Sequence, residues 1–339
     1  MKPRLAFVDH SFHQKTKSSD FFVELLEQSF EVVRVWDEAW QGGAHATAAQ
    51  INELHVEAVV MWQAKLPEAE IRQITVPITW VPMFDQSQGL AWGSGESAQV
   101  RKQGLKVIAF CQAIAENLAN HGVEVLPVRY FIEPSATPIT ELSKPSVFLW
   151  QRAEIGFDQV KALFGHWPEV SFVVKVDPDP GTTPCEISAE DRKKFRVTVM
   201  QGFLPRDEYL ELVGKCNIYV APRSAEGIGL SFLEAMAKGM IVAAPDRPTM
   251  NEYIQHGRNG WLFSVQRPQS ITQCDLSAMS QTTLREVAEG LRHWKSQATG
   301  VSSFIAKPSP YPFQGSSPSL KARILLEKVH RRIYRVLGR

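Results

Sequence analysis

Short apolar runs alternate with longer segments of helical periodicity along most of the chain. The runs include RLAFVDH (4–10), FEVVRVW (30–36) and VEAVVMW (56–62), and segments such as SSDFFVELLEQ (18–28) place apolar residues at helical spacing. Because the runs are continuously apolar rather than alternating, they are typical of parallel strands that helices cover on both faces. The pattern therefore predicts an α/β protein with parallel sheets.

A segment rich in proline and serine, residues 132–145, separates two such series, and the alternation restarts with SVFLW at residue 146. A chain of 339 residues is long for one hydrophobic core, so two domains are expected. We predict two facing Rossmann-like, doubly wound domains, residues 1–135 and 136–315. Ligands are expected in the cleft between them, at the carboxyl ends of the strands.

The composition excludes several classes of protein. The net charge of +1 gives no reason to expect a nucleic-acid partner. The four cysteines are scattered without a C-x-x-C pair, which argues against a disulfide framework and a zinc site and fits a reducing compartment. The N-terminus lacks a signal-peptide pattern, and no window reaches the roughly 18 apolar residues of a membrane span. We therefore expect a cytoplasmic protein.

The stretch PRSAEGIGLSFLEAMAKG (222–239) joins an apolar strand to a helix through a turn with two glycines. Gly227 and Gly229 allow backbone conformations closed to other residues and a close approach of a ligand. The helix is predicted to begin near Leu230 and to end at Gly239. Its free N–H groups and its dipole form an anion site suited to a phosphate.

Two acidic residues flank this anion site. Glu226 lies in the turn, and Glu234 lies in the helix. A carboxylate accepts hydrogen bonds from a vicinal diol such as that of a ribose, so the arrangement suits a nucleotide-sugar. The helix dipole alone also favours an acid in the first turn, so the spacing by itself leaves a purely structural interpretation open.

Residues 222–263 closely resemble the E-x7-E signature region of retaining GT-B glycosyltransferases of the glycosyltransferase family 4 type. The preceding GFLPRDEYLELVGKCNIYVAP and the final NEYIQHGRNGWLF extend the resemblance to about a fifth of the chain. It implies a GT-B fold and an enzyme that moves a sugar from a nucleotide-diphosphate donor to a hydroxyl of a saccharide or glycolipid acceptor, with retention. It also implies surface polysaccharide or glycoconjugate biosynthesis and no required metal or other cofactor.

The resemblance assigns roles to individual residues of the donor half. Glu226 contacts the donor sugar near the reacting carbon, and Glu234 binds the nucleotide ribose. The remaining positions offer backbone groups to the sugar, the diphosphate or the base: Gly227, Ile228, Gly229, Leu230, and Gly202, Phe203 and Leu204 of MQGFL.

The cations that neutralise the leaving diphosphate match the family only in part. Arg152 fits the family's arginine, but GFD stands where the lysine is usual, and Lys161 lies farther along its helix. Arg223 is a candidate substitute. The absence of the family's usual lysine keeps a second hypothesis open: the chain is a catalytically impaired GT-B homologue that acts as a binding or scaffold subunit. A nucleotide-sugar epimerase is a third, although no acid/base set for it is identifiable in the first domain.

Candidates for the acceptor side are fewer. His10 and His13 follow the first strand, and Asp85 lies in the loop PMFDQSQGLAWGSGES (82–97). We expect His10 and Asp85 to face the acceptor, while a structural histidine and a surface loop are the competing interpretations.

The pair Asp177 and Asp179 in KVDPDPG is spaced like two metal ligands. Prolines and a glycine punctuate this segment, so we interpret it as a turn and expect no metal there.

Residues 316–339 are predicted to form an amphipathic helix with seven basic residues and the single acid Glu327 in 319–339. One interpretation is that its apolar face packs back on the N-terminal domain. The other is a membrane-surface helix that brings the enzyme to lipid-linked acceptors. The two do not exclude each other.

Overall fold

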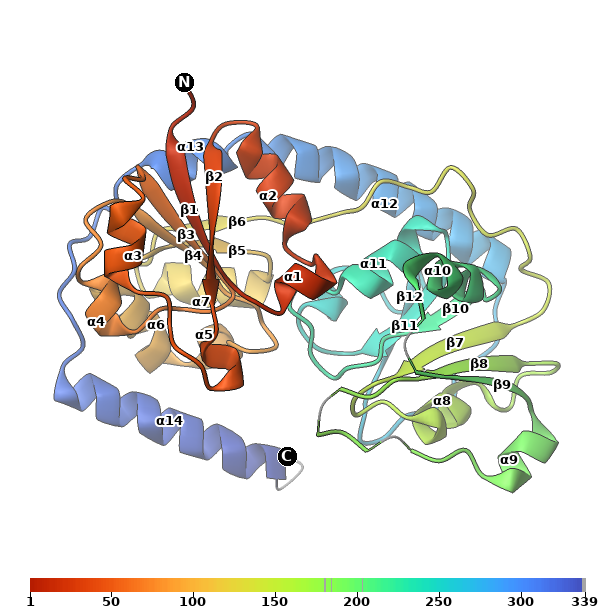
Figure 1. Ribbon diagram of the computed structural model, residues 1–339. Helices are drawn as coiled ribbons and strands as arrows, with labels where there is room; N and C mark the ends of the chain where they lie inside the picture. The colour runs from red at the N-terminus through yellow and green to blue at the C-terminus, as the bar shows by residue number, and fades with distance from the viewer. Residues whose placement is uncertain (180, 184, 203, 337–339) are drawn as a thin grey trace. The chain divides into compact units, whose positions relative to one another are not determined.

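A computed structural model of the protein describes residues 1–179, 181–183, 185–202 and 204–336, without the side chains of residues 333–336. The chain divides into two compact units (Figure 1). Unit 1 comprises Met1–Arg129 and His293–Arg339, and unit 2 comprises Tyr130–Arg292. Each unit is built on its own parallel sheet.

Unit 1 contains a sheet of six strands in the order β2-β1-β3-β4-β5-β6. The strands are β1 (Arg4–His10), β2 (Glu31–Asp37), β3 (Ala58–Trp62), β4 (Ile78–Val81), β5 (Lys106–Ala109) and β6 (Val125–Pro127). The helices between them are α1 (His13–Thr16), α2 (Asp20–Glu27), the 3-10 helix η1 (Ala39–Gln41), α3 (Ala48–Glu53), α4 (Glu68–Ile71), α5 (Gly89–Trp92), α6 (Ser94–Lys102) and α7 (Gln112–Asn120).

Unit 2 contains a second sheet of six strands, in the order β12-β11-β10-β7-β8-β9. The strands are β7 (Ser146–Gln151), β8 (Ser171–Val176), β9 (Arg196–Gln201), β10 (Ile218–Val220), β11 (Ile241–Pro245) and β12 (Gly260–Phe263). The helices are α8 (Phe157–Phe164), α9 (Ala189–Lys194), α10 (Arg206–Gly214), α11 (Leu230–Ala237) and the 3-10 helix η2 (Met250–Glu252).

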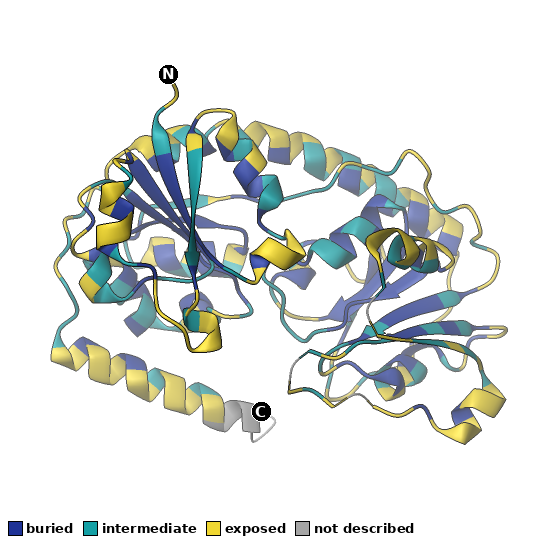
Figure 2. Cartoon of the chain, viewed as in Figure 1, coloured by how far each residue is buried: buried dark blue, intermediate teal, exposed yellow. Residues whose placement is uncertain are grey.

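The strand orders explain why the apolar runs are buried, and they show where the winding of each sheet reverses. Every residue of β3, β4, β5, β10 and β11 is buried, as expected for strands covered on both faces (Figure 2). The winding reverses between β1 and β3 in unit 1 and between β7 and β10 in unit 2. Ligands of open α/β sheets bind outside the carboxyl ends of the strands at such a reversal. The predicted fold of two Rossmann-like parallel sheets is confirmed.

The chain returns from unit 2 to unit 1 within a single long helix, α12 (Leu276–Ala298). The next helix, α13 (Val301–Ala306), is fixed to β5 by the fully buried Lys106, whose Nζ donates to the carbonyls of Phe304, Ile305 and Lys307. An ammonium group offers three donors, so it satisfies carbonyl groups that the end of a helix leaves free.

The last helix, α14 (Pro318–Val336), lies along α6. The Glu327 carboxylate accepts hydrogen bonds from the Gly95 amide at 3.1 and 3.2 Å, at the positive N-terminal end of α6. Arg331 pairs with Glu96 at 2.9 Å. Among the residues that the structure describes, no helix has both the length and the apolar composition to cross a membrane.

Candidate functional site

The loops that follow β7 and β10 meet at the winding reversal of unit 2. The two strands are paired, with Ile218 opposite Val147 and Val220 opposite Leu149. Arg152 follows the last residue of β7, and Arg223 lies three residues after the last residue of β10. The sheet therefore brings together two arginines that are 71 residues apart in the sequence.

Both arginines bind one carboxylate, that of Asp179 in the loop after β8. The Arg152 Nη2 and Nε atoms lie 2.8 and 3.0 Å from Asp179 Oδ1. Arg223 donates to Asp179 Oδ2 through Nε at 3.1 Å and through Nη2. Burial alone would raise the pKa of Asp179, but the hydrogen bonds and charges of Arg152 and Arg223 outweigh it and hold the pKa below its usual value. Two guanidinium groups are thus fixed around one anionic group.

A third cation lies close to this arrangement. The Arg152 guanidinium is 4.5 Å from the centre of the Trp150 ring, and the Lys175 Nζ is 4.3 Å from it. Lys175 also pairs with Asp177 at 2.5 Å. Asp177 and Asp179 are therefore each bound by cationic side chains. The amide of Thr182 donates to the Asp179 carbonyl at 2.9 Å.

Gly229 shapes the start of α11. Its φ is +80°, and a Cβ at this position would lie 1.9 Å from the Phe232 ring, so both the backbone and the packing require glycine. Helix geometry leaves the first amides of α11 without partners inside the helix. The predicted helix from Leu230 to Gly239 is confirmed, since α11 spans Leu230–Ala237 and Gly239 follows with a φ of +77°.

Glu226 lies in the half-buried turn that leads to Gly229. Its carbonyl accepts a hydrogen bond from Thr249 Oγ1 at 3.2 Å. Burial raises the pKa of Tyr219 to about 12, and the negative charge of Glu226 contributes to this increase. Ser224, in the same turn, donates its amide and its hydroxyl to the Glu154 carboxylate after β7, at 3.3 and 3.1 Å. The turn is therefore held in place from both sides.

Glu234 forms an ion pair with Arg206, whose Nη2 lies 2.9 Å from Glu234 Oε1. Arg206 is the first residue of α10, two residues after the end of the predicted base-binding segment at Leu204. In that segment Gly202 has a φ of +80° and donates its amide to the Val176 carbonyl at 2.9 Å, Leu204 is half-buried, and Phe203 lies outside the described residues. The ion pair thus joins Glu234 to the start of α10, next to that segment.

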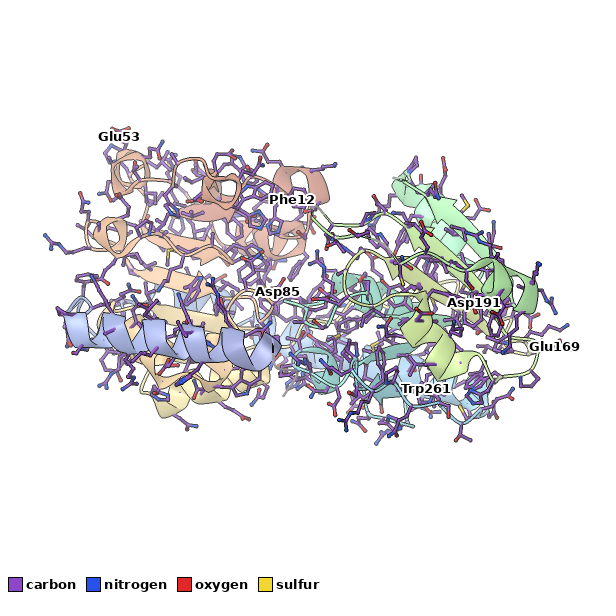
Figure 3. The ribbon with its side chains drawn as sticks, turned by 90° about the horizontal axis from the view of Figure 1, so that it is seen from below. Phe12, Glu53, Asp85, Glu169, Asp191 and Trp261 are labelled. Atoms are coloured by element: carbon purple, nitrogen blue, oxygen red, sulfur yellow. The ribbon has the colours of Figure 1, made fainter. Side chains whose placement is uncertain are left out.

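Lys161 forms ion pairs away from Arg152 and Arg223. Its Nζ lies 3.1 Å from Asp158 and 3.0 Å from Asp191, an α9 residue labelled in Figure 3. The hydrogen bonds to Asp191 and Asp158 raise the Lys161 pKa. The cation that joins Arg152 is therefore Arg223. The sequence alone does not indicate the contacts of Asp179 and Glu154 with this turn and these arginines, because the contacts depend on which strands are neighbours.

The acceptor-side candidates both lie beyond carboxyl ends of the unit 1 sheet. His10 ends β1, and Asp85 lies in the loop after β4, where its Oδ1 accepts from the Gln86 amide at 3.0 Å (Figure 3). Because β3 lies between β1 and β4, one strand of the sheet separates the two residues. His10 instead lies against His13, with ring centres 3.8 Å apart.

Residues 185–288 match the family model described as glycosyl transferases group 1. This segment contains Glu226, α11 and Glu234. A comparison with curated protein sequences found no match to the chain.

Among solved structures, the chain is similar to a glycosyltransferase from Rickettsia africae ESF-5 (12% identity, 90% of this chain and 99% of that chain, TM-score 0.59). It is also similar to sucrose-phosphate synthase from Thermosynechococcus elongatus (13% identity, 99% and 100%, TM-score 0.52). A third similar structure is Anabaena Alr3699/HepE in complex with UDP-glucose (14% identity, 90% and 96%, TM-score 0.51). These likenesses concern the fold. The matched segment supports a glycosyltransferase, and the likenesses support the GT-B fold.

Proposed function

We propose that the protein transfers a sugar from a nucleotide-diphosphate donor to a hydroxyl of a saccharide or glycolipid acceptor, with retention, as enzymes of the glycosyltransferase family 4 type do. The observation that carries this proposal is the pair of arginines on Asp179, next to the turn that contains Glu226 and leads into α11. Fixed positive charge and free helix amides suit a diphosphate. Surface polysaccharide or glycoconjugate synthesis is the setting that we propose.

The reaction needs negative charge to be stabilised as the donor bond breaks. In the proposed step, the bond between the sugar C1 and the diphosphate oxygen breaks, and the acceptor oxygen forms the new bond to C1. The acceptor proton goes to the departing phosphate, so no protein base is required. Arg152 and Arg223 stabilise the diphosphate, and Arg223 takes the place of the family's usual lysine. Since Asp179 already orients both guanidinium groups, little reorganisation accompanies the step.

The other residues bind and orient the donor. Glu226 accepts hydrogen bonds from sugar hydroxyls, and Glu234, oriented by Arg206, accepts them from the ribose. Backbone groups of the glycine turn and of the segment around Gly202 and Leu204 contact the diphosphate, the sugar and the base. We propose that this half works without a metal ion. His10 and Asp85 remain the proposed contacts on the acceptor side.

The test is a reaction of the protein with a panel of nucleotide sugars, followed by proton NMR of the anomeric region. We expect one donor to be consumed, by transfer or slow hydrolysis, with the first sugar product in the donor's anomeric configuration. The opposite anomer would contradict retention. Donor binding without turnover for any acceptor would favour the scaffold hypothesis, and a changed sugar still attached to its nucleotide would favour an epimerase.

A Glu234→Ala variant is expected to bind UDP about tenfold to a hundredfold more weakly, because hydrogen bonds to a charged group contribute roughly 1.5–3 kcal/mol. UDP is the first probe because similar structures hold UDP-glucose. Titration calorimetry measures the change. Glu211→Ala is the matched control, since Glu211 also forms a single ion pair, with Lys215 at 2.9 Å, but lies on α10 away from the turn. Equal affinities in the two variants would contradict the role of Glu234.

We also propose a cytoplasmic enzyme that contacts the inner face of a membrane through α14. Leu320 and Ile324 are buried, whereas Leu325, Leu326 and Val329 are 64%, 63% and 45% exposed among basic side chains (Figure 2). Exposed apolar groups beside lysines and arginines suit an anionic lipid surface.

A Leu325→Glu/Leu326→Glu variant is expected to lose most of its co-sedimentation with phosphatidylglycerol vesicles. Its thermal midpoint should stay within a few degrees of wild type, since both side chains are already exposed. Neutral phosphatidylcholine vesicles give the control for the charge contribution. Unchanged binding to the anionic vesicles would contradict the membrane role of this face.

A further inference from the structure

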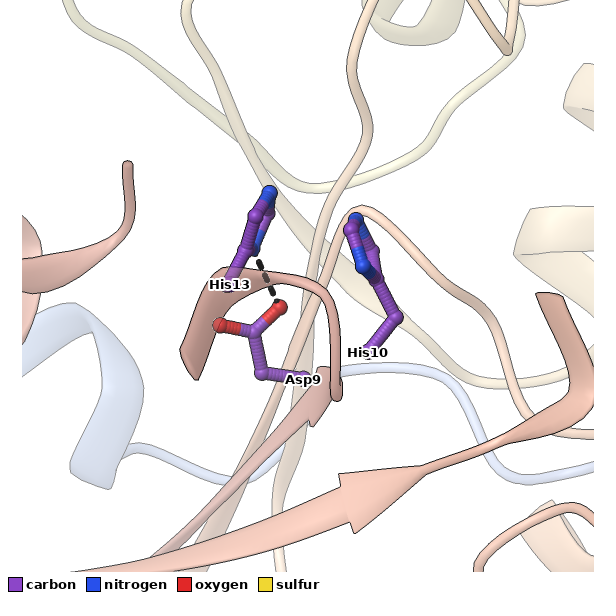
Figure 4. Close-up of side chains that lie close together, drawn as sticks. All are labelled: Asp9, His10 and His13. Carbon is purple, nitrogen blue, oxygen red and sulfur yellow. Dashed lines mark hydrogen bonds and ion pairs between the residues drawn. The ribbon is translucent and has the colours of Figure 1, made fainter. Parts of the chain in front are cut away.

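Unit 1 has a buried cluster of ligand-type side chains at its own winding reversal. Asp9 and His10 are the last residues of β1, and His13 is the first residue of α1. Asp9 is fully buried, and His10 and His13 are only 8% and 7% exposed. Figure 4 shows the His13 ring above the Asp9 carboxylate, with the His10 ring facing it. The proposed donor chemistry of unit 2 uses none of these groups.

His10 offers a free ring nitrogen to this cluster. Its Nε2 lies 3.1 Å from the Gln63 amide oxygen, which can only accept, so Nε2 carries the hydrogen and Nδ1 keeps a lone pair. Within the part of the chain that the structure describes, this buried Nδ1 has no hydrogen-bond partner. A buried acceptor with no donor calls for a further ligand.

Gln63 is itself fixed in an unusual backbone conformation. It follows β3 with a φ of +61°, in the left-handed region that a non-glycine residue adopts only where its surroundings hold it there. Its amide donates to the Val81 carbonyl at 2.8 Å, and its carbonyl accepts from Trp80 Nε1 at 3.2 Å. The backbone therefore holds the Gln63 side chain on His10, and through it the orientation of the His10 ring.

Asp9 and His13 complete the cluster. Asp9 Oδ1 lies 2.7 Å from His13 Nδ1, and Asp9 Oδ2 accepts from Ser19 Oγ at 2.6 Å. One ligand atom from each of Asp9, His10 and His13 can be chosen so that all lie within 4.8 Å of one another. Tetrahedral Zn²⁺ ligands at about 2.0–2.2 Å from the metal stand roughly 3.4 Å apart. This separation lies between the 2.7 Å of the Asp9–His13 contact and the 4.8 Å limit of the cluster, so small shifts of the three side chains suffice.

We propose that Asp9, His10 and His13 bind a divalent transition-metal ion, for which Zn²⁺ is the first probe. Two imidazole nitrogens and one carboxylate oxygen form a common set of protein ligands for such ions. Gln63 and Ser19 supply the hydrogen bonds that orient metal ligands in such sites. Since the cluster provides three protein ligands, at least one coordination position stays open to water or to an oxygen ligand.

The competing interpretation is an Asp9–His13 hydrogen-bonded pair that works without an ion. That interpretation accounts for the 2.7 Å contact but leaves the buried His10 Nδ1 without a role. The metal proposal gives all three side chains a role. It stands independently of the proposed donor site, because it concerns residues of unit 1 and its test uses no nucleotide.

The experiment titrates tag-free full-length protein, first dialysed against EDTA, with Zn²⁺ by calorimetry and with Co²⁺ by absorption. We expect one ion per chain and visible Co²⁺ bands that shift when azide enters the open position. His10→Ala and His13→Ala should each weaken binding at least a hundredfold. Gln63→Ala keeps all three ligands and should weaken it about tenfold to a hundredfold. His45→Ala is the matched control, since His45 also pairs with a carboxylate, Asp37 at 3.0 Å, yet lies outside the cluster.

Circular dichroism of each variant establishes that it is folded. Absence of saturable one-to-one binding by the folded wild type would overturn the proposal in favour of the ion-free Asp9–His13 pair. Unchanged binding in folded His10→Ala and His13→Ala would also overturn it, because the ion would then be held elsewhere. Neither result would affect the donor site, whose nucleotide binding is measured separately.

Discussion

An Arg152→Ala variant is expected to lose about a hundredfold to a thousandfold in kcat, the effect usual for removing one preorganised donor from a developing anion. Arg152 reaches Asp179 with two nitrogen atoms, 2.8 and 3.0 Å away, so its guanidinium is already held where the proposed diphosphate departs. An alanine leaves Arg223 as the remaining arginine on Asp179. Steady-state kinetics with saturating donor measure the loss.

Arg223→Ala is expected to behave in the same way, because both arginines bind the same carboxylate. Lys161→Ala is the matched control. It removes a cation from the neighbouring helix, but one that is bound to Asp158 and Asp191, so kcat should stay within about threefold of wild type. If Lys161→Ala lost as much activity as Arg223→Ala, the assignment of the second cation would be wrong.

A Gly229→Ala variant is expected to lose about 2–5 kcal/mol of unfolding free energy, together with nucleotide binding. A φ of +80° costs an L-residue roughly 1–2 kcal/mol, and overpacking a buried site costs roughly 1–3 kcal/mol. The added Cβ would lie 1.9 Å from the Phe232 ring, which is 1% exposed and packs on Tyr253 with ring centres 5.6 Å apart. The ring therefore has little room to move. Equilibrium urea unfolding measures the change.

Gly257→Ala separates the two causes of this loss. Gly257 has a φ of +77°, but no atom lies within 4 Å of a Cβ built there. It should therefore lose only the conformational part, about 1–2 kcal/mol, and should keep nucleotide binding. Equal losses in the two variants would show that the contact with Phe232 does not constrain the turn.

The sequence predicted the two sheets well because buried parallel strands leave a local mark. All five residues of β3, for example, are apolar and buried. The return of the chain to unit 1 within α12 has no comparable local signal in the sequence. It depends on packing between distant residues: Trp294 lies against Phe110 and Phe21, with ring centres 6.1 and 6.5 Å apart. The spacing of apolar residues within one segment does not reveal contacts between residues so far apart in the sequence.

The candidate site likewise contains residues that the local sequence predicts and residues that only the strand order brings together. Arg152, Glu226 and Glu234 could be predicted from a resemblance carried by a continuous segment and one strand end. The proposed role of Asp179 could not be predicted in this way. Asp179 meets Arg152 and Arg223 only because β10, β7 and β8 are neighbours in the sheet. In unit 1, His10 and His13 drew attention by residue type, whereas Gln63 contributes through its position after a neighbouring strand. Residue type and local order point to chemistry, but sheet order decides which groups meet.

The central claim is that the winding reversal of unit 2 binds a nucleoside diphosphate through Arg152. Titration calorimetry of wild type and Arg152→Ala with UDP, GDP, ADP, dTDP and CMP, in the presence of EDTA, tests it most directly. We expect one diphosphate to bind the wild type with one-to-one stoichiometry and at least tenfold more weakly to the variant. If no nucleotide bound the folded wild type, or if the variant bound as tightly, the account of the donor site would be contradicted.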